Sequence, residues 1–176
     1  KRPYVVVNMA MTADGKIATA NRALTSFGSR RDHDHLLELR ATADAVLCGA
    51  STAGGENITL GPGPDRFRRK RLRRGLAEHN LRLVASGSAG LNPQSSLFEH
   101  RSSPIIILTT RRAPFAKLTA LRQVADEVAP FGATKLDLGA ALQWLHEKWK
   151  VKRLICEGGG ELNDAMFRAG LVDELH

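Results

Sequence analysis

Short runs of apolar, often β-branched residues recur along the chain, separated by longer amphipathic or polar segments. Such runs are typical of strands that are buried on both faces of a sheet. They predict strands over residues 4–9, 45–48, 81–85, 105–108 and 154–156. Residues 30–42 and 138–149 have the apolar spacing of amphipathic helices, and Ser29 stands where an N-cap hydroxyl is favoured. This alternation predicts an α/β fold in one domain over residues 1–176, with a largely parallel central sheet flanked by helices.

Four turns of small or polar residues follow predicted strands directly, at residues 49–52, 86–88, 109–112 and 158–161. Ligands bind beyond the carboxyl ends of parallel strands, so these turns are expected at one ligand-binding edge. The last turn is the most informative, because Gly158, Gly159 and Gly160 lack Cβ atoms and precede a predicted helix with free N–H groups. Such a place favours a diphosphate, although a tight strand-to-helix turn without a ligand has the same pattern.

The composition is that of an ordinary globular protein, with 43% hydrophobic and 25% charged residues. No apolar stretch reaches the roughly 20 residues of a membrane span, and the N-terminus lacks the order of a signal peptide, so we expect a cytoplasmic protein that does not bind membranes. Cys48 and Cys156 each end an apolar run, which favours buried reduced thiols over a disulfide or a metal site. No metal site is predicted.

The formal charge of +8 is concentrated in one segment, predicted to be helical as far as Gly75. Its seven basic residues are Arg66, Arg68, Arg69, Lys70, Arg71, Arg73 and Arg74, and without them the formal charge would be +1. The segment is compatible with a solvated helix beside a site, with attraction of a phosphorylated small molecule, or with binding of nucleic acid or another polyanion. Phe67 is the only aromatic residue within it, which disfavours nucleic acid.

Five motifs occur in the order of a known family. They are residues 11–18 (MTADGKIA) after the first predicted strand, Leu39-Arg40-Ala41, residues 44–52, Glu157-Gly158-Gly159-Gly160, and residues 171–175 (LVDEL). Over essentially its whole length, the chain resembles the reductase domain of riboflavin biosynthesis, and Asn8 and Met11 resemble the stand-alone archaeal and fungal diaminopyrimidine reductases more than the bacterial domain fused to a deaminase.

The resemblance implies a dihydrofolate reductase-like fold, a homodimer and a phosphorylated small-molecule substrate. The implied activity is NADPH-dependent reduction of a phosphoribosylamino-pyrimidine to its ribitylamino form, with hydride transfer to C1′ of the open-chain imine. The alternative is a reductase of the same fold with another pterin-like or carbonyl substrate. Residues 170–176 have the pattern of a turn entering a further strand, so we also expect C-terminal strands beyond His176 or a partner that completes the sheet.

By position, the resemblance places Ala10 beside the nicotinamide, residues 158–162 around the diphosphate and residues 86–88 at the adenosine end. Arg111 or Arg112 would add charge for a 2′-phosphate. The residues assigned to the cofactor are Ala10, Gly49, Thr52 at the end of its strand, Ser86, Gly87, Ser88, Arg111, Gly158, Gly159, Gly160, Glu161 and Leu162.

Asn8, Arg40, Leu60 and Glu157 are assigned to the substrate. Arg40 would hold the 5′-phosphate, unless it is a surface partner of Glu38 or Asp44, and Glu157 would accept hydrogen bonds from the pyrimidine. Two segments depart from the family pattern. In residues 52–63 the usual acidic pair is reduced to Glu56, and glycines stand where threonine and arginine are expected, so Arg66 or Arg68 is a candidate replacement. Residues 24–27 also differ from the expected serine and aromatic residue.

Asp14 and Lys16 are the catalytic candidates, because they are the ionisable groups nearest to the nicotinamide end in sequence and either could relay a proton. The pair Asp14-Gly15 is also a turn signature in its own right, with the aspartate capping local N–H groups.

Overall fold

A computed structural model describes residues 1–17, 29–55, 58–99 and 101–176. Within these ranges a seven-stranded sheet has the strand order β5-β4-β3-β2-β6-β1-β7, and every pair of neighbours is parallel. The strands are β1 (Tyr4–Val7), β2 (Ala45–Gly49), β3 (Leu81–Ala85), β4 (Ile105–Thr109), β5 (Glu127–Pro130), β6 (Arg153–Cys156) and β7 (Glu174–Leu175). The parallel α/β fold predicted from the sequence is confirmed.

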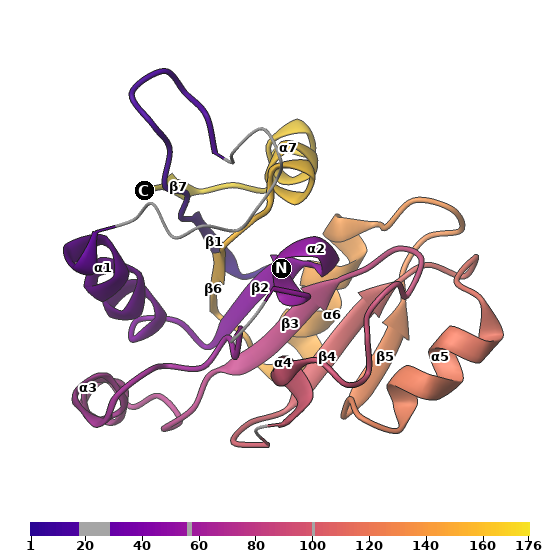
Figure 1. Cartoon of the computed structure of the whole chain (residues 1–176), viewed down its shortest axis with the longest axis horizontal. Coiled ribbons are helices and arrows are strands. Elements are labelled where there is room, and N and C mark those ends of the chain that lie inside the picture. Colours follow the sequence, from indigo (N-terminus) through magenta and orange to yellow (C-terminus); the bar gives the residue numbers. More distant parts are fainter. Residues whose placement is uncertain (18–28, 56–57, 100) are drawn as a thin grey trace.

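Helices cover both faces of the sheet (Figure 1). One face packs against α6 (Leu138–Trp149) and α7 (Gly160–Arg168), through a core that joins Leu142 and Met166 to residues of β1, β2, β3, β4 and β6. The helices on the other face are α1 (Arg30–Arg40), α2 (Ala50–Ala53), α3 (Asp65–Arg73), α4 (Ser96–Glu99) and α5 (Phe115–Arg122). Phe67 of α3 packs on Leu37 and Ala41, so α3 lies against α1 rather than directly on the sheet.

The strongly patterned elements lie where the sequence predicts them. Residues 81–85 and 138–149 match β3 and α6, and the Ser29 hydroxyl accepts the Asp32 N–H at 3.1 Å as the N-cap of α1. The strand predicted within residues 170–176 is also confirmed, because β7 pairs with β1.

Thr52 was expected at the end of a strand, and that prediction is wrong. Strand β2 ends at Gly49, and Thr52 lies in the short helix α2.

Three helices and one strand have no counterpart among the elements that the sequence predicts. They are α2, α4, α5 and β5. Helix α5 lacks an amphipathic pattern, because Phe115 is 77% exposed while Leu121 is buried. Strand β5 begins with a glutamate and ends with a proline, and both residue types are depleted in strands. Among the helices described, none is long and apolar enough to cross a membrane.

Cys48 and Cys156 are both free and fully buried, as the sequence predicts. They belong to the cores on opposite faces of the sheet, which keeps the two thiols apart. Burial raises the pKa of both thiols, that of Cys156 to about 11, because a thiolate would lose its hydration there.

We expect neither cysteine to react with a thiol reagent such as DTNB in the native protein at about pH 8, since the thiolate is the reactive species and neither sulfur is accessible. The absorbance of the reaction with this reagent, read at about 412 nm, should report both thiols only after denaturant is added. Rapid labelling of either one without denaturant would contradict the burial described here.

Candidate functional site

The turn between β6 and α7 is joined to the end of β2. The Gly49 N–H donates to the Gly158 carbonyl oxygen at 2.7 Å. Gly158 has φ +77°, and a Cβ there would lie 3.0 Å from Nδ2 of Asn163. A side chain at this position would therefore be strained and crowded. The peptide between Gly158 and Gly159 is cis.

Helix α7 begins directly after this turn, and its N-cap, Gly159, supplies no side-chain hydrogen bond. The hydroxyl of Thr52 borders the turn, because a Cβ built on Gly159 would lie 3.5 Å from Thr52 Oγ1. The positive end of the α7 dipole and its first N–H groups point out of the turn, an arrangement that favours an anion.

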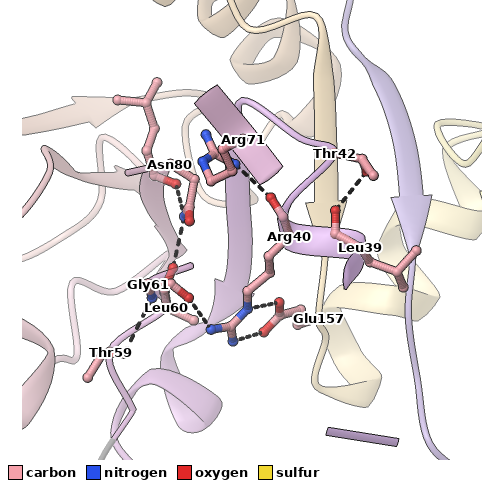
Figure 2. A network of polar contacts seen from close by, with 10 residues as sticks. Leu39, Arg40, Thr42, Thr59, Leu60, Gly61, Arg71, Asn80 and Glu157 are labelled. Carbon is pink, nitrogen blue, oxygen red and sulfur yellow. Dashed lines mark hydrogen bonds and ion pairs between the residues drawn. The ribbon is translucent and has the colours of Figure 1, made fainter. Parts of the chain in front are cut away.

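Arg40 and Glu157 form a bidentate ion pair at the same edge of the sheet (Figure 2). Nε and Nη2 of Arg40 each donate to one carboxylate oxygen of Glu157 at 2.6 Å. The side chains are only 11% and 10% exposed. Burial opposes the charge on Arg40, but the charge and hydrogen bonds of Glu157 outweigh it and raise the pKa of the guanidinium. The suggestion that Arg40 pairs with Glu38 or Asp44 is therefore wrong.

Further contacts hold this ion pair in place. Nη1 of Arg40 donates to the Gly61 carbonyl oxygen at 2.6 Å, which ties α1 to the loop before α3. The backbone N–H of Glu157 donates to the Leu47 carbonyl oxygen at 2.9 Å, so the residue remains anchored to β2 after β6 has ended. Glu157 immediately precedes Gly158, and thus the carboxylate and the anion-favouring turn are adjacent.

A second turn lies at the ends of β3 and β4. The Gly87 carbonyl oxygen accepts the Thr110 hydroxyl at 2.7 Å and the Thr110 N–H at 3.3 Å, which joins the two strand ends. Ser86 is buried, and its hydroxyl accepts the Gly90 N–H at 3.0 Å. Ser88, Arg111 and Arg112 are exposed, so their side chains are available to a ligand in this turn.

The family model described as the RibD C-terminal domain matches residues 3–176. The chain belongs to the RibD C-terminal domain family. It is 33% identical over 174 residues to the 2,5-diamino-6-ribosylamino-4(3H)-pyrimidinone 5′-phosphate reductase of Archaeoglobus fulgidus, an alignment that covers 99% of this chain and 78% of that protein. The reductase of the same name from Methanothermobacter thermautotrophicus is 34% identical over 174 residues, covering 99% and 76%.

Solved structures have the same fold. A pyrimidine reductase-like protein from Corynebacterium diphtheriae matches with a TM-score of 0.81 and 24% identity, covering 98% of this chain and 72% of that one. The predicted membership of the riboflavin-biosynthesis reductase domains is therefore confirmed for this RibD C-terminal domain.

The structure brings most of the predicted site residues of this RibD C-terminal domain to the carboxyl edge of the sheet. Gly49, Thr52 and the turn 158–162 lie together, and Arg40 contacts Glu157. Asn8 follows β1 at the same edge and donates its N–H to the Cys156 carbonyl oxygen at 3.0 Å, and Ala10 is exposed beyond it. Among the residues described, no group of three or more His, Cys, Asp and Glu side chains is placed to hold a metal ion.

Leu60 has a different environment from the one expected of a substrate contact. Its side chain is 1% exposed and packs in the core with Val46 and Val84, while its carbonyl oxygen accepts Nδ2 of Asn80 at 2.8 Å. It anchors the loop before α3, and its contact with substrate stays a prediction. Glu56 and residues 24–27 lie outside the residues described.

Asp14 and Lys16 pair with each other in an exposed turn that extends away from the sheet (Figure 1). Lys16 Nζ lies 2.5 Å from Asp14 Oδ2, and the Gly15 N–H closes the turn by donating to the Thr12 carbonyl oxygen. The hydrogen bonds from Lys16 and Thr12 lower the pKa of Asp14. A carboxyl group with a lowered pKa is a poor proton donor near neutral pH, so the geometry favours the turn role over the catalytic one.

Most charges of the basic segment are locally compensated or buried. Arg66 pairs with Asp34, Lys70 with Glu38, and Arg68 with Asp65 and Glu78. Arg71 is buried against backbone carbonyl groups. This arrangement favours a solvated helix beside the site, and it leaves Arg69, Arg73 and Arg74 as the exposed cations of the segment outside these pairs.

Two residues at the site were missed by the sequence interpretation. Asn163 lies under Gly158 and accepts the Cys156 thiol at 3.5 Å. The sequence feature that could have revealed Asn163 is a polar residue on the buried face of α7, three residues before Met166. Ile17 lies over the turn, since its Cδ1 would be 2.9 Å from a Cβ on Gly160. No sequence pattern predicts that contact, because it depends on the chain folding back from the exposed turn.

We expect Asp14→Asn to leave the turnover of this enzyme family's reaction within about twofold of wild type between about pH 6 and 9, because the carboxylate serves the turn and stays ionised throughout that range. Steady-state rates at several pH values test this. If the rate of the variant no longer fell at one end of the pH range where the wild-type rate falls, Asp14 would be a catalytic residue after all.

Proposed function

We propose that this RibD C-terminal domain is an NADPH-dependent reductase that converts a phosphoribosylamino-pyrimidine to its ribitylamino form. The buried Arg40–Glu157 pair, directly beside an anion-favouring glycine turn, carries the proposal. The Archaeoglobus and Methanothermobacter relatives are named as reductases of 2,5-diamino-6-ribosylamino-4(3H)-pyrimidinone 5′-phosphate, and the similarity to them spans nearly the whole chain. That diamino compound is the substrate we propose here.

In this proposal the cofactor occupies the edge between β2 and β6, with its diphosphate at the turn 158–162. The cofactor residues are Ala10, Gly49, Thr52, Gly87, Ser88, Arg111, Gly158, Gly159, Gly160, Glu161 and Leu162, together with the backbone of Ser86. The exposed Ser88 hydroxyl and Arg111 guanidinium support a choice of NADPH over NADH, since both groups can bind a 2′-phosphate.

The substrate is proposed to lie against Glu157, with Asn8 and Arg40 nearby. A carboxylate accepts hydrogen bonds only, and the pyrimidine presents amino and ring N–H donors. Because Arg40 fixes both oxygens of Glu157, the carboxylate is held in one orientation before substrate arrives. Bound there, NADPH would supply the hydride that reduces C1′ of the open-chain imine, and water would supply the proton that the imine nitrogen takes up to become the amine. The chain's contribution is to hold the two reactants in line and exclude water.

Consumption of NADPH, followed at about 340 nm, tests the proposal directly with the ribosylamino-pyrimidine phosphate as substrate. NADH replaces NADPH in one control, and dihydrofolate or the deaminated pyrimidine replaces the substrate in others. Turnover with NADPH and the diamino compound supports the full proposal. Cofactor binding without turnover on any pyrimidine would overturn the substrate assignment, and absence of cofactor binding would overturn the proposal itself.

We expect Glu157→Gln to lower kcat/KM about 100-fold, because a charge-assisted acceptor is lost at the pyrimidine. It should also lower the free energy of unfolding by about 3 kcal/mol, since Arg40 is left buried without a counter-charge.

Asp173→Asn is the matched control for Glu157→Gln. Asp173 forms a bidentate pair with Arg2, with distances of 2.6 and 2.9 Å, and accepts the Val5 N–H near the start of β1, at the other end of the strands. This more exposed pair should cost about 1 kcal/mol of stability and leave kcat/KM unchanged. Equal losses of activity in the two variants would show that the effect of Glu157→Gln is merely structural.

Gly158→Ala should raise the Kd for NADPH at least about tenfold, because a Cβ strains the turn at φ +77° and presses on Asn163. Gly75→Ala is its control, since Gly75 has φ +72° with open space around the position. Both variants should lose about 1 kcal/mol of stability. Fluorescence titration with NADPH should separate them, and equal affinities would argue against a cofactor at this turn.

A further inference from the structure

Arg71 is one of seven basic residues in its segment, but its surroundings differ from those of an ordinary surface arginine. Its side chain is 1% exposed. Nη1 donates to the carbonyl oxygens of Arg40 and Ala43, each at 2.6 Å, and Nε donates to the Ala77 carbonyl oxygen at 2.9 Å. Each of these acceptors is a backbone group. Burial lowers the pKa of Arg71, and the nearby charge of Asp44 partly offsets that effect.

Two of these carbonyl groups lie at the C-terminus of α1. Arg40 is the last residue of the helix, so its carbonyl has no partner within the helix and lies at the negative end of the helix dipole. From the backbone beyond the helix it accepts the Ala43 N–H, at 3.4 Å. A buried guanidinium is well suited to such a place, because it satisfies several carbonyl groups at once and complements the dipole. Arg71 therefore fixes the position at which the Arg40 side chain leaves the helix (Figure 2).

The Arg40 side chain in turn fixes Glu157 through two hydrogen bonds. We infer that Arg71 is a positioning residue for the proposed reaction, which holds the Glu157 carboxylate in its substrate-binding orientation through the backbone and side chain of Arg40. This inference rests on the proposed function. Arg71 itself is too deeply buried to touch a ligand, and its contribution lies in the placement of Glu157.

Arg82 provides a matched control within the same chain. It is also 1% exposed, and it donates to the Leu97 and Ser103 carbonyl oxygens at 3.1 and 2.5 Å and to the Ser103 hydroxyl at 3.1 Å. Burial lowers its pKa as it does for Arg71. Its contacts lie beneath α4 and the start of β4, and none involves Arg40 or Glu157. The two arginines thus share burial and donate mainly to backbone carbonyl groups, but only Arg71 is bonded to Arg40.

The experiment compares Arg71→Lys with Arg82→Lys in the full chain. Lysine keeps the charge but cannot reproduce the planar set of donors. We expect both variants to melt at lower temperature. Only Arg71→Lys should raise the KM for the pyrimidine, by about tenfold, while the Kd for NADPH stays unchanged in both. In an Arg40→Lys background, Arg71→Lys should cause no further rise, because its effect passes through Arg40.

Wild-type turnover is measured first, so that failure of the proposed function is distinguished from failure of this inference. If wild type turns over and the two variants have the same pyrimidine KM, Arg71 is only a structural residue and the inference is overturned. Should Arg71→Lys fail to fold, wild-type protein with ¹⁵N-labelled arginine gives an independent test. Binding of the ribitylamino product should then shift the Nε–H signals of Arg40 and Arg71 but not that of Arg82. A shift at Arg40 without one at Arg71 would overturn the inference.

Discussion

The candidate site depends on the pairing of β6 with β1 on one side and β2 on the other. The register sets Cys156 opposite Val7 and Leu47, so β1 and β6 end at the same level and β2 continues for two more residues to Gly49. The continuations of β1 and β6 therefore leave the sheet together. The backbone of Glu157 still bonds to β2, and the next residue begins the glycine turn. A change in this register by one residue would move the Glu157 side chain to the opposite face, away from Arg40.

The central strands were predictable because they are buried on both faces and read as uninterrupted apolar runs. Helix α6 was predictable because one of its sides alone is apolar. Helix α5 and strand β5 were not, since Phe115 is exposed and β5 combines a charged residue with a proline. These elements are held by tertiary packing at one edge of the sheet, and local pattern carries little information about such packing.

The site was partly predictable for similar reasons. Three consecutive glycines after a strand are a local signal, and the turn lies where that signal places it. The Arg40–Glu157 pair joins residues 117 positions apart, and both had been assigned separately to the substrate. Only the order of strands in the sheet brings them together. Arg71 is buried because it lies one helical turn after the buried Phe67 and so on the same side of α3. The basic residues around it hide this pattern in the sequence, because nothing distinguishes Arg71 from its exposed neighbours. The same neighbours pair with acidic residues of α1 and α3, so the formal charge overstates the field at this surface.

The contact between Arg40 and the Gly61 carbonyl oxygen has a consequence for how this enzyme family can diversify. Every amino acid presents a backbone carbonyl, so an anchor of this kind places no demand on the side chain at position 61. The loop can exchange side chains while its path past the site is retained. The departures from the family pattern in residues 52–63 fall in the stretch where such an anchor allows them. Side chains of this loop can therefore change without rebuilding the ion pair of Arg40 with Glu157.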